Sequence, residues 1–159
     1  MIGVLVKYIW CEVEEEKRSA FSKAQEEWDH LAEVEGFLGQ FGGWGESGEA
    51  VILGFWESRQ AYQHFMEYVH DTIFLENNQG KTYRSITVTL YEGEVFKQEW
   101  LENSESGGRL YLSGKPNEES AVTFLSEMRE SLSVAFSEME GASVIDLEPK
   151  WNVMKKGEN

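Results

Sequence analysis

The segment over residues 4–13 constrains the fold most, because it has the pattern of a β-strand that is apolar on both faces. One face carries Val4, Val6, Tyr8 and Trp10, and the other carries Leu5, Ile9 and Cys11. A strand with one face in water alternates apolar and polar residues, whereas a strand that is covered on both sides does not. We therefore expect a sheet with a layer packed against each of its faces.

Residues 1–93 show strand and helix patterns in the order strand, helix, strand, strand, helix, strand. The two helices are expected over residues 14–34 and 58–75, where apolar residues recur at spacings of three and four. Ser58 is the expected N-cap of the second helix. The later strands are expected over residues 37–44, 50–56 and 86–91. This order is that of a ferredoxin-like βαββαβ unit, so the fold class is α+β.

The remaining residues predict a C-terminal strand-helix-strand (βαβ) extension over 109–153, joined to the first module by a polar linker over 94–108. The expected helix begins at Pro116 and carries an apolar stripe that includes Phe124, Leu132 and Phe136. A glycine turn ahead of a tryptophan occurs in both halves, which suggests a partial internal repeat. Residues 154–159 are expected to form a tail.

Charge and cysteine content exclude several classes of function. The chain carries 29 acidic and 14 basic residues, for a net charge of −15, which disfavours binding to nucleic acid or to anionic membranes. No apolar run is long enough to cross a membrane and the first residues do not resemble a secretory signal, so the expected location is the cytoplasm. The lone Cys11 cannot form an internal disulfide and is expected to be a small buried residue.

Two further stretches, residues 35–41 (EGFLGQF) and 56–62 (WESRQAY), together resemble the antibiotic-biosynthesis-monooxygenase superfamily and its haem-degrading branch. The chain is also similar to an uncharacterised bacterial subfamily of YdbC type. The resemblance implies a dimeric α/β barrel, in which two sheets from a homodimer pack face to face. It also implies monooxygenase chemistry in which an electron-rich substrate reacts with oxygen itself. The aromatic residues on and near the strands independently suggest an aromatic-lined barrel cavity for a flat hydrophobic ligand.

The haem-degrading branch uses an Asn on the first strand, a Trp on the second helix and a His near the end of that helix. The corresponding positions fall near Lys7 or Tyr8, at Phe65 and at about Leu75, so this triad is not retained. Haem remains a candidate cofactor only through His70, which lies five residues before the expected position and faces about 140° away from it on a helix. The spacing of His64 and His70 does not predict a metal site.

The candidate site residues are therefore one histidine and a set of aromatic residues. His70 borders the apolar stripe of its helix and is the candidate catalytic group; the alternative is a histidine on the helix flank that pairs with Glu67, Asp71 or solvent. The candidate ligand-binding residues are Trp10, Trp44, Trp56 and Phe65, and their alternative role is ordinary packing in the core and in a dimer interface. His30 and His64 are expected on the surface.

Two hypotheses for function follow. The first is a barrel protein that binds a small hydrophobic or aromatic ligand and acts as a monooxygenase, either without a cofactor or with haem. The second is a non-enzymatic interaction or structural module, in which the C-terminal extension fills the open face of the sheet and replaces a partner subunit.

Overall fold

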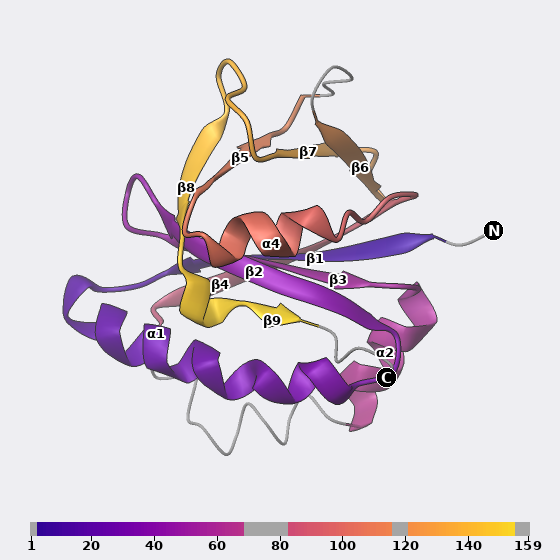
Figure 1. Cartoon of the computed structure of the whole chain (residues 1–159), viewed down its shortest axis with the longest axis horizontal. Helices are drawn as coiled ribbons and strands as arrows, with labels where there is room; N and C mark the ends of the chain where they lie inside the picture. The colour runs from indigo at the N-terminus through magenta and orange to yellow at the C-terminus, as the bar shows by residue number, and fades with distance from the viewer. Residues whose placement is uncertain (1–2, 69–82, 116–120, 155–159) are drawn as a thin grey trace.

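The computed structural model describes residues 3–68, 83–115 and 121–154, and it shows an antiparallel sheet that closes into a barrel within one chain (Figure 1). The strands are β1 (Val4–Glu12), β2 (Phe37–Gly45), β3 (Ala50–Trp56), β4 (Ser85–Gly93), β5 (Arg109–Ser113), β6 (Val122–Ser126), β7 (Ser131–Ala135), β8 (Ser143–Leu147) and β9 (Val153–Met154). Their order is β3-β1-β4-β6-β7-β5-β8-β2-β9, and β2 also pairs with β3, which closes the ring. The fold is therefore α+β.

The helices lie on two sides of the barrel wall (Figure 1). Along the outside run α1 (Arg18–Glu26), the 3-10 helix η2 (Glu27–Glu33) and α2 (Arg59–Tyr68). The 3-10 helix η1 (Glu15–Lys17) precedes α1, so the helix expected over 14–34 forms in three successive pieces. The Ser58 hydroxyl accepts a hydrogen bond from the Ala61 amide at 3.1 Å, which confirms the predicted N-cap. No helix among the described residues is long and apolar enough to cross a membrane.

The two faces of β1 pack against different layers, as its sequence pattern predicts. Val4 and Val6 belong to the cluster that fills the barrel interior, with Tyr8 and Trp10 packed against it. The alternate residues Leu5 and Cys11 belong to two clusters on the outer face, which α1, η2 and α2 cover. This alternation places Lys7 on the outer face as well, because successive side chains of a strand point in opposite directions.

The stretches over 35–41 and 56–62 lie in direct contact. Phe37 pairs with Trp56 across β2 and β3, and their ring centres are 5.3 Å apart. Gly36 has a φ of 86°, which favours glycine, and its carbonyl accepts a hydrogen bond from the Glu57 amide at 2.8 Å. A Cβ on Gly36 would lie 2.3 Å from the Cβ of Ala61. The two stretches therefore fix how α2 joins the sheet.

The prediction of a helix from Pro116 onward is wrong for the residues that the structure describes. Residues 122–135 instead form the β6–β7 hairpin, with Arg129 in the turn at a φ of 63°. Phe124, Leu132 and Val134 point into the barrel, so residues two apart share a face. The apolar positions fit both the helical spacing of three or four residues and the strand spacing of two. Pairing with the neighbouring strands of the barrel wall selects the strand. The suggested partial internal repeat therefore loses its helix and rests on the glycine turns alone.

The segment predicted as a linker over 94–108 contains the helix α4 (Glu99–Glu105), which lies inside the barrel (Figure 1). Trp100 and Leu101 are buried at 4% and 0% exposure in the interior cluster. A Cβ on Gly39 of β2 would lie 2.8 Å from the Leu101 side chain, so this glycine lets α4 rest directly on the strand. The acidic and small residues that resemble a linker form the exposed side of a short buried helix.

The C-terminal residues complete the wall. The 3-10 helix η4 (Pro149–Trp151) follows β8, and β9 pairs with Gly39 and Gln40 of β2. Trp151 is buried against Phe21 and Trp44, and its indole N–H donates a hydrogen bond to the Ser22 hydroxyl at 2.9 Å. This end of the chain therefore fastens α1 to the barrel.

Candidate functional site

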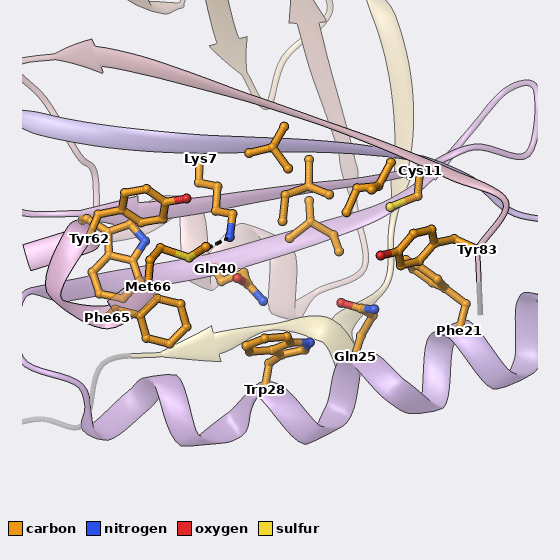
Figure 2. Close-up of a pocket in the computed structure, with 15 residues that line it drawn as sticks. Lys7, Cys11, Phe21, Gln25, Trp28, Gln40, Tyr62, Phe65, Met66 and Tyr83 are labelled. Carbon is orange, nitrogen blue, oxygen red and sulfur yellow. Dashed lines mark hydrogen bonds between the residues drawn. The ribbon is translucent and has the colours of Figure 1, made fainter. Parts of the chain in front are cut away.

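The described residues enclose a cavity of about 370 Å³ on the outer side of the barrel wall, between the sheet and the helices (Figure 2). It is distinct from the barrel interior, which α4 and the aromatic side chains around it fill. Its lining residues come from the strands and the helices alike: Lys7, Ile9, Cys11, Phe21, Gln25, Trp28, Gln40, Ile52, Trp56, Tyr62, Phe65, Met66, Tyr83, Ile86 and Val88. We call this cavity the helix–sheet pocket.

Aromatic side chains form much of its wall. Phe65 of α2 lies between Trp56 and Trp28, with ring centres 5.0 Å and 6.3 Å away. Tyr62, one turn earlier on α2, packs on Trp56 with ring centres 5.9 Å apart. Ile9 and Ile52 of the strands supply aliphatic surface opposite the helices. Such a wall suits a flat apolar molecule.

Lys7 is the one lysine or arginine among the described lining residues, and it is buried at 9% exposure. Its Nζ donates to Met66 Sδ at 3.7 Å and lies 5.3 Å from the centre of the Tyr62 ring (Figure 2). A thioether is a weak acceptor, and no carboxylate of the described residues pairs with this ammonium. Burial lowers the pKa of Lys7 from 10.5 to about 8.

Two buried amides face the same space (Figure 2). Gln25 of α1 and Gln40 of β2 are 5% and 8% exposed. A β-bulge between Phe37 and Gly39 shifts the register of β2. Because of this extra residue, Phe37 and Gln40 both point outward although they are three positions apart, whereas Phe41 points into the barrel. The bulge therefore brings the amide of Gln40 into the pocket.

Gly54 of β3 lies between Lys7 and Gln40. It pairs with Lys7 on β1 and with Gln40 on β2. A Cβ at Gly54 would lie 3.3 Å from Gln40 Oε1, 3.8 Å from Trp56 Nε1 and 4.0 Å from Lys7 Cβ. The missing side chain lets the Gln40 amide lie close over the Gly54 backbone, and we call the small space bordered by Gly54, Gln40, Trp56 and Lys7 the Gly54 hollow.

The other titratable groups of the lining are neutral at physiological pH. Burial raises the pKa of the Cys11 thiol to about 12, so this cysteine is not a nucleophile and is the small buried residue that was predicted. Burial also raises the pKa of Tyr62, opposed by the nearby Arg59, and the pKa of Tyr83, which Cys11 raises further. Among these residues, the positive charge of the pocket therefore resides on Lys7.

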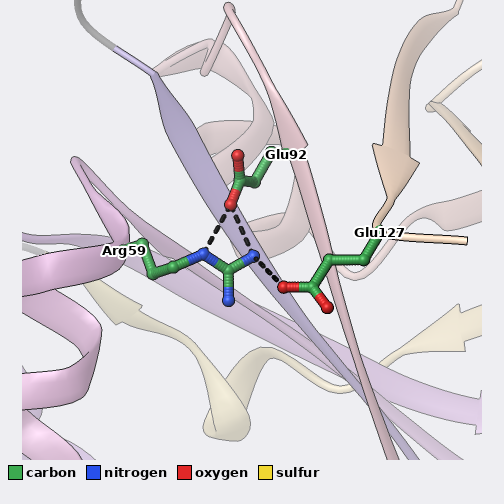
Figure 3. Close-up of polar contacts among 3 residues, drawn as sticks. All are labelled: Arg59, Glu92 and Glu127. Atoms are coloured by element: carbon green, nitrogen blue, oxygen red, sulfur yellow. Dashed lines mark hydrogen bonds and ion pairs between the residues drawn. The ribbon is translucent and has the colours of Figure 1, made fainter. Parts of the chain in front are cut away.

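The start of α2, which carries Tyr62, Phe65 and Met66, is anchored by Arg59 (Figure 3). The Arg59 Nε donates to Glu92 Oε1 of β4 at 2.6 Å, and its Nη2 lies 3.6 Å from Glu127 Oε1 in the β6–β7 turn. This contact joins the helix that lines the pocket to both halves of the barrel. A partly exposed ion pair of this kind contributes about 1 kcal/mol or less to stability, so it positions α2 more than it stabilises the fold.

The structure brings together only part of the candidate site. Trp56 and Phe65 line the pocket, whereas Trp10 packs against the barrel interior. Trp44 packs on Phe21 and Trp151 beside a shallow depression, with the Arg18 guanidinium 4.3 Å above its ring. His70 lies outside the described residues. His64 is exposed on α2, and the backbone of His30 lies in η2.

Four residues of this site were not predicted from the sequence: Lys7, Gln25, Gln40 and Gly54. The sequence nevertheless carries signals for two of them. Lys7 is a charged residue in the middle of a strand that is otherwise apolar on both faces. Gly54 interrupts the apolar run of β3, and a glycine within a strand often marks a close approach of a ligand or another backbone. The β-bulge that turns Gln40 outward has no sequence signal that periodicity alone can detect.

The described lining does not fit haem. A haem iron needs an axial ligand such as a neutral imidazole or a thiolate, and these lining residues include no histidine. The raised pKa keeps the Cys11 thiol protonated, and Met66 Sδ already contacts Lys7. The described residues also hold no cluster of three His, Cys, Asp or Glu side chains suited to a metal. We therefore derive no chemical step through haem.

Comparison with known proteins places the chain in a family. The family described as "Domain of unknown function (DUF4937)" matches residues 5–91, which is more than half of the chain. The chain belongs to this family. The matched DUF4937 region contains β2, β3, α1, α2 and almost all of β1 and β4, and hence every described lining residue of the helix–sheet pocket.

Among relatives of this DUF4937 protein, the uncharacterized protein YdbC of Bacillus subtilis (strain 168) is 41% identical over 107 residues, which cover 64% of this chain and 90% of YdbC. Two solved structures share the fold of this chain. One is described as a "putative monooxygenase" from Lactobacillus acidophilus NCFM, with a TM-score of 0.59, 10% identity and 96% coverage of both chains. The other, described in the same words, comes from Fusobacterium nucleatum, with a TM-score of 0.53, 11% identity and coverage of 94% of this chain and 78% of that chain. At such low identity they show the fold alone.

Proposed function

We propose that this DUF4937 protein binds a small, flat, hydrophobic ligand in the helix–sheet pocket and acts on it as a monooxygenase of the antibiotic-biosynthesis type. The observation that carries the proposal is an aromatic-walled cavity of about 370 Å³ that remains open in a chain whose barrel interior is filled. This volume lies within the range of small-molecule sites, which are roughly 300–1,000 Å³.

Several features support the monooxygenase part of the proposal. The two structural neighbours are described as "putative monooxygenase", and the strand order β4-β1-β3-β2 with α1 and α2 on one face supports a ferredoxin-like first half. Reaction of O₂ with an electron-rich ring methylene gives a ring carbonyl and water, so atoms and electrons balance without a further reductant. The Lys7 ammonium would stabilise the negative charge that develops on such a substrate as it releases a proton to solvent, and the released proton is balanced by the one that the product water takes up.

A non-enzymatic module is the second candidate, because the C-terminal residues do fill the barrel. Trp100 packs against Phe55, Phe124 and Phe136, with ring centres 5.5 Å, 6.5 Å and 6.4 Å away. The same closure within one chain covers the sheet face that a dimeric α/β barrel packs against a partner subunit. The filled interior leaves the helix–sheet pocket untouched, so it does not exclude a ligand.

Blocking the pocket is expected to abolish ligand binding. Val88 lines the pocket at 44% exposure, so a Val88→Trp variant places an indole in the cavity with little strain on the fold. We expect the affinity for N-phenyl-1-naphthylamine, a neutral fluorescent probe, to fall by about tenfold or more in a fluorescence titration.

Val95 supplies the matched control, because it is equally exposed at 42% and lies outside the pocket lining. Val95→Trp should bind the probe as the wild type does. Saturable binding that is equal in wild type and Val88→Trp would place the probe elsewhere and contradict the proposal, as would no saturable binding to the wild type.

A further inference from the structure

We propose that the helix–sheet pocket selects aromatic ligands that carry an acidic group, and that the Gly54 hollow holds this group as a carboxylate or phenolate against the Lys7 ammonium. This inference rests on the proposed function, since it names the class of ligand that the same pocket takes.

The buried ammonium of Lys7 has no counter-ion among the described residues. Its ammonium is removed from water at 9% exposure, and its described contacts are a thioether sulfur and the face of a tyrosine ring. A buried charge normally has a counter-ion or several hydrogen bonds, because an isolated one is costly. The described part of the chain supplies neither, although acidic residues outnumber basic ones by 29 to 14. An anionic ligand would supply the missing partner.

The Gly54 hollow lies beside Lys7, on the neighbouring strand. Gly54 separates Lys7 from Gln40 across neighbouring strands, and a Cβ above its backbone would already be in tight contact with Gln40 Oε1, so a bound group reaches this backbone when the Gln40 amide moves aside. Gln40 Oε1 and Trp56 Nε1 border the hollow, at 3.3 Å and 3.8 Å from the position a Cβ would occupy. Rotation of the Gln40 amide presents its NH₂ group, so three donors would surround a bound oxyanion.

A wall of aromatic side chains adjoins the Gly54 hollow. Trp56, Phe65 and Trp28 extend from the Gly54 hollow toward the helices, in successive ring contacts. A ligand whose acidic group lies at Gly54 can therefore place its ring system against these side chains. The combination of one charged end and an apolar body matches an aromatic acid or a phenol in its ionised form.

Among the described residues, the titratable groups around Lys7 give the pH dependence a single source. Cys11 on β1, Tyr62 on α2 and Tyr83 before β4 share the lining, and burial keeps the pKa of each above its ordinary value. They stay uncharged while Lys7, whose pKa is about 8, loses its proton. Affinity for an anion should therefore be constant below pH 8 and should fall as the pH rises above it.

The test compares two probes of nearly equal shape, 2-naphthoate and the neutral 2-naphthamide, by isothermal titration calorimetry at pH 7. Naphthoate should bind the wild-type chain about tenfold to a hundredfold more tightly, as expected for hydrogen bonds to a charged group. The preference should shrink between pH 8 and pH 10, where naphthoate itself keeps its charge. Equal affinities for the two probes with a flat pH profile would overturn the inference.

Variants of Lys7 separate charge from shape. Lys7→Met should remove the preference for naphthoate and change naphthamide affinity by no more than about threefold, because the side chains are similar in length. Lys97→Met is the matched control, since Lys97 is exposed and distant from the lining. Gly54→Ala fills the hollow without a change of charge and should also weaken naphthoate selectively. An unchanged preference in Lys7→Met would overturn the inference.

The two proposals fail in different ways. If both probes bind, both are lost in Val88→Trp and neither is preferred, the ligand pocket stands and its selectivity for anions is wrong. If neither probe binds the folded wild-type chain, the inference falls with the pocket on which it rests.

Discussion

Replacing Trp100 by alanine is expected to lower the free energy of unfolding by about 4 kcal/mol, because it empties the centre of the barrel. Trp100 is 4% exposed and lies among the rings of Phe55, Phe96, Phe124 and Phe136. Loss of the indole leaves a cavity that these rings cannot fill without moving β3 or β6. Equilibrium unfolding in urea, followed by circular dichroism, measures the change.

The control for Trp100 comes from the same helix. Asn103 is exposed on α4, so Asn103→Ala should change the free energy of unfolding by less than about 0.5 kcal/mol. Trp100→Phe keeps a ring in the interior and should lose clearly less than the alanine variant, which provides a measurable case if the latter does not fold. A loss of under about 1 kcal/mol in Trp100→Ala would mean that α4 is the surface linker that the sequence suggests rather than part of the core.

Replacing Lys7 by methionine is expected to have the opposite sign and to stabilise the protein by about 3 kcal/mol at pH 7. The pKa of Lys7 is lowered from 10.5 to about 8 in the folded chain, so the unfolded chain binds this proton more tightly. The resulting cost to folding is fully present below pH 8 and disappears as the pH rises to 10.5, which means that wild-type stability should rise over this interval.

Urea unfolding at pH 7, 9 and 10.5 tests this prediction for Lys7. The Lys7→Met chain should be the more stable at pH 7, and its advantage should be smaller at pH 9 and almost gone at pH 10.5. Lys97→Met, at an exposed position, should follow the wild type throughout. A Lys7→Met chain that is less stable than the wild type at pH 7 would mean that Lys7 is a structural residue with a partner.

The two Lys7 experiments support each other. A residue that costs the fold stability and at the same time provides anion binding has the trade-off that is common at functional sites. A residue kept for structure would give the reverse result in the unfolding experiment and would leave the preference for naphthoate unchanged.

The first half of the chain was predictable because its local patterns agree with its tertiary contacts. The alternation of β1 separates the interior residue Val6 from the outer residue Leu5, and the glycine at residue 36 marks the turn that α2 packs against. Ser58 begins α2 as its residue type predicts. In each case, neighbours within a few positions determine the conformation.

The second half was not predictable in this way, because long-range contacts decide between two patterns. Phe124 and Leu132 lie on a helical stripe in the sequence, yet they also alternate inward along β6 and β7, where pairing with β4 and β5 selects the strand. Trp100 and Leu101 are two apolar residues in an acidic segment, and only the hollow of a closed barrel makes them core.

Long-range contacts also limited how much of the candidate site could be predicted from the sequence. Trp56 and Phe65 were identified from their residue type and position on predicted elements, and both line the pocket. Trp10 and Trp44 have the same residue type but point into other clusters, because the strand alternation and the contacts of η4 decide their direction. Lys7 was not predicted to be a site residue, because the sequence alone does not show that Gly54 and Gln40 lie beside it.

The measurement that tests the central claim most directly is a crystal structure of the protein grown with 2-naphthoate. We expect the carboxylate above Gly54, within hydrogen-bonding distance of Lys7 Nζ, with the naphthalene ring against Trp56 and Phe65. A naphthoate in the barrel interior beside Trp100, or a helix–sheet pocket that stays free of it at saturating concentration, would contradict the proposed ligand site.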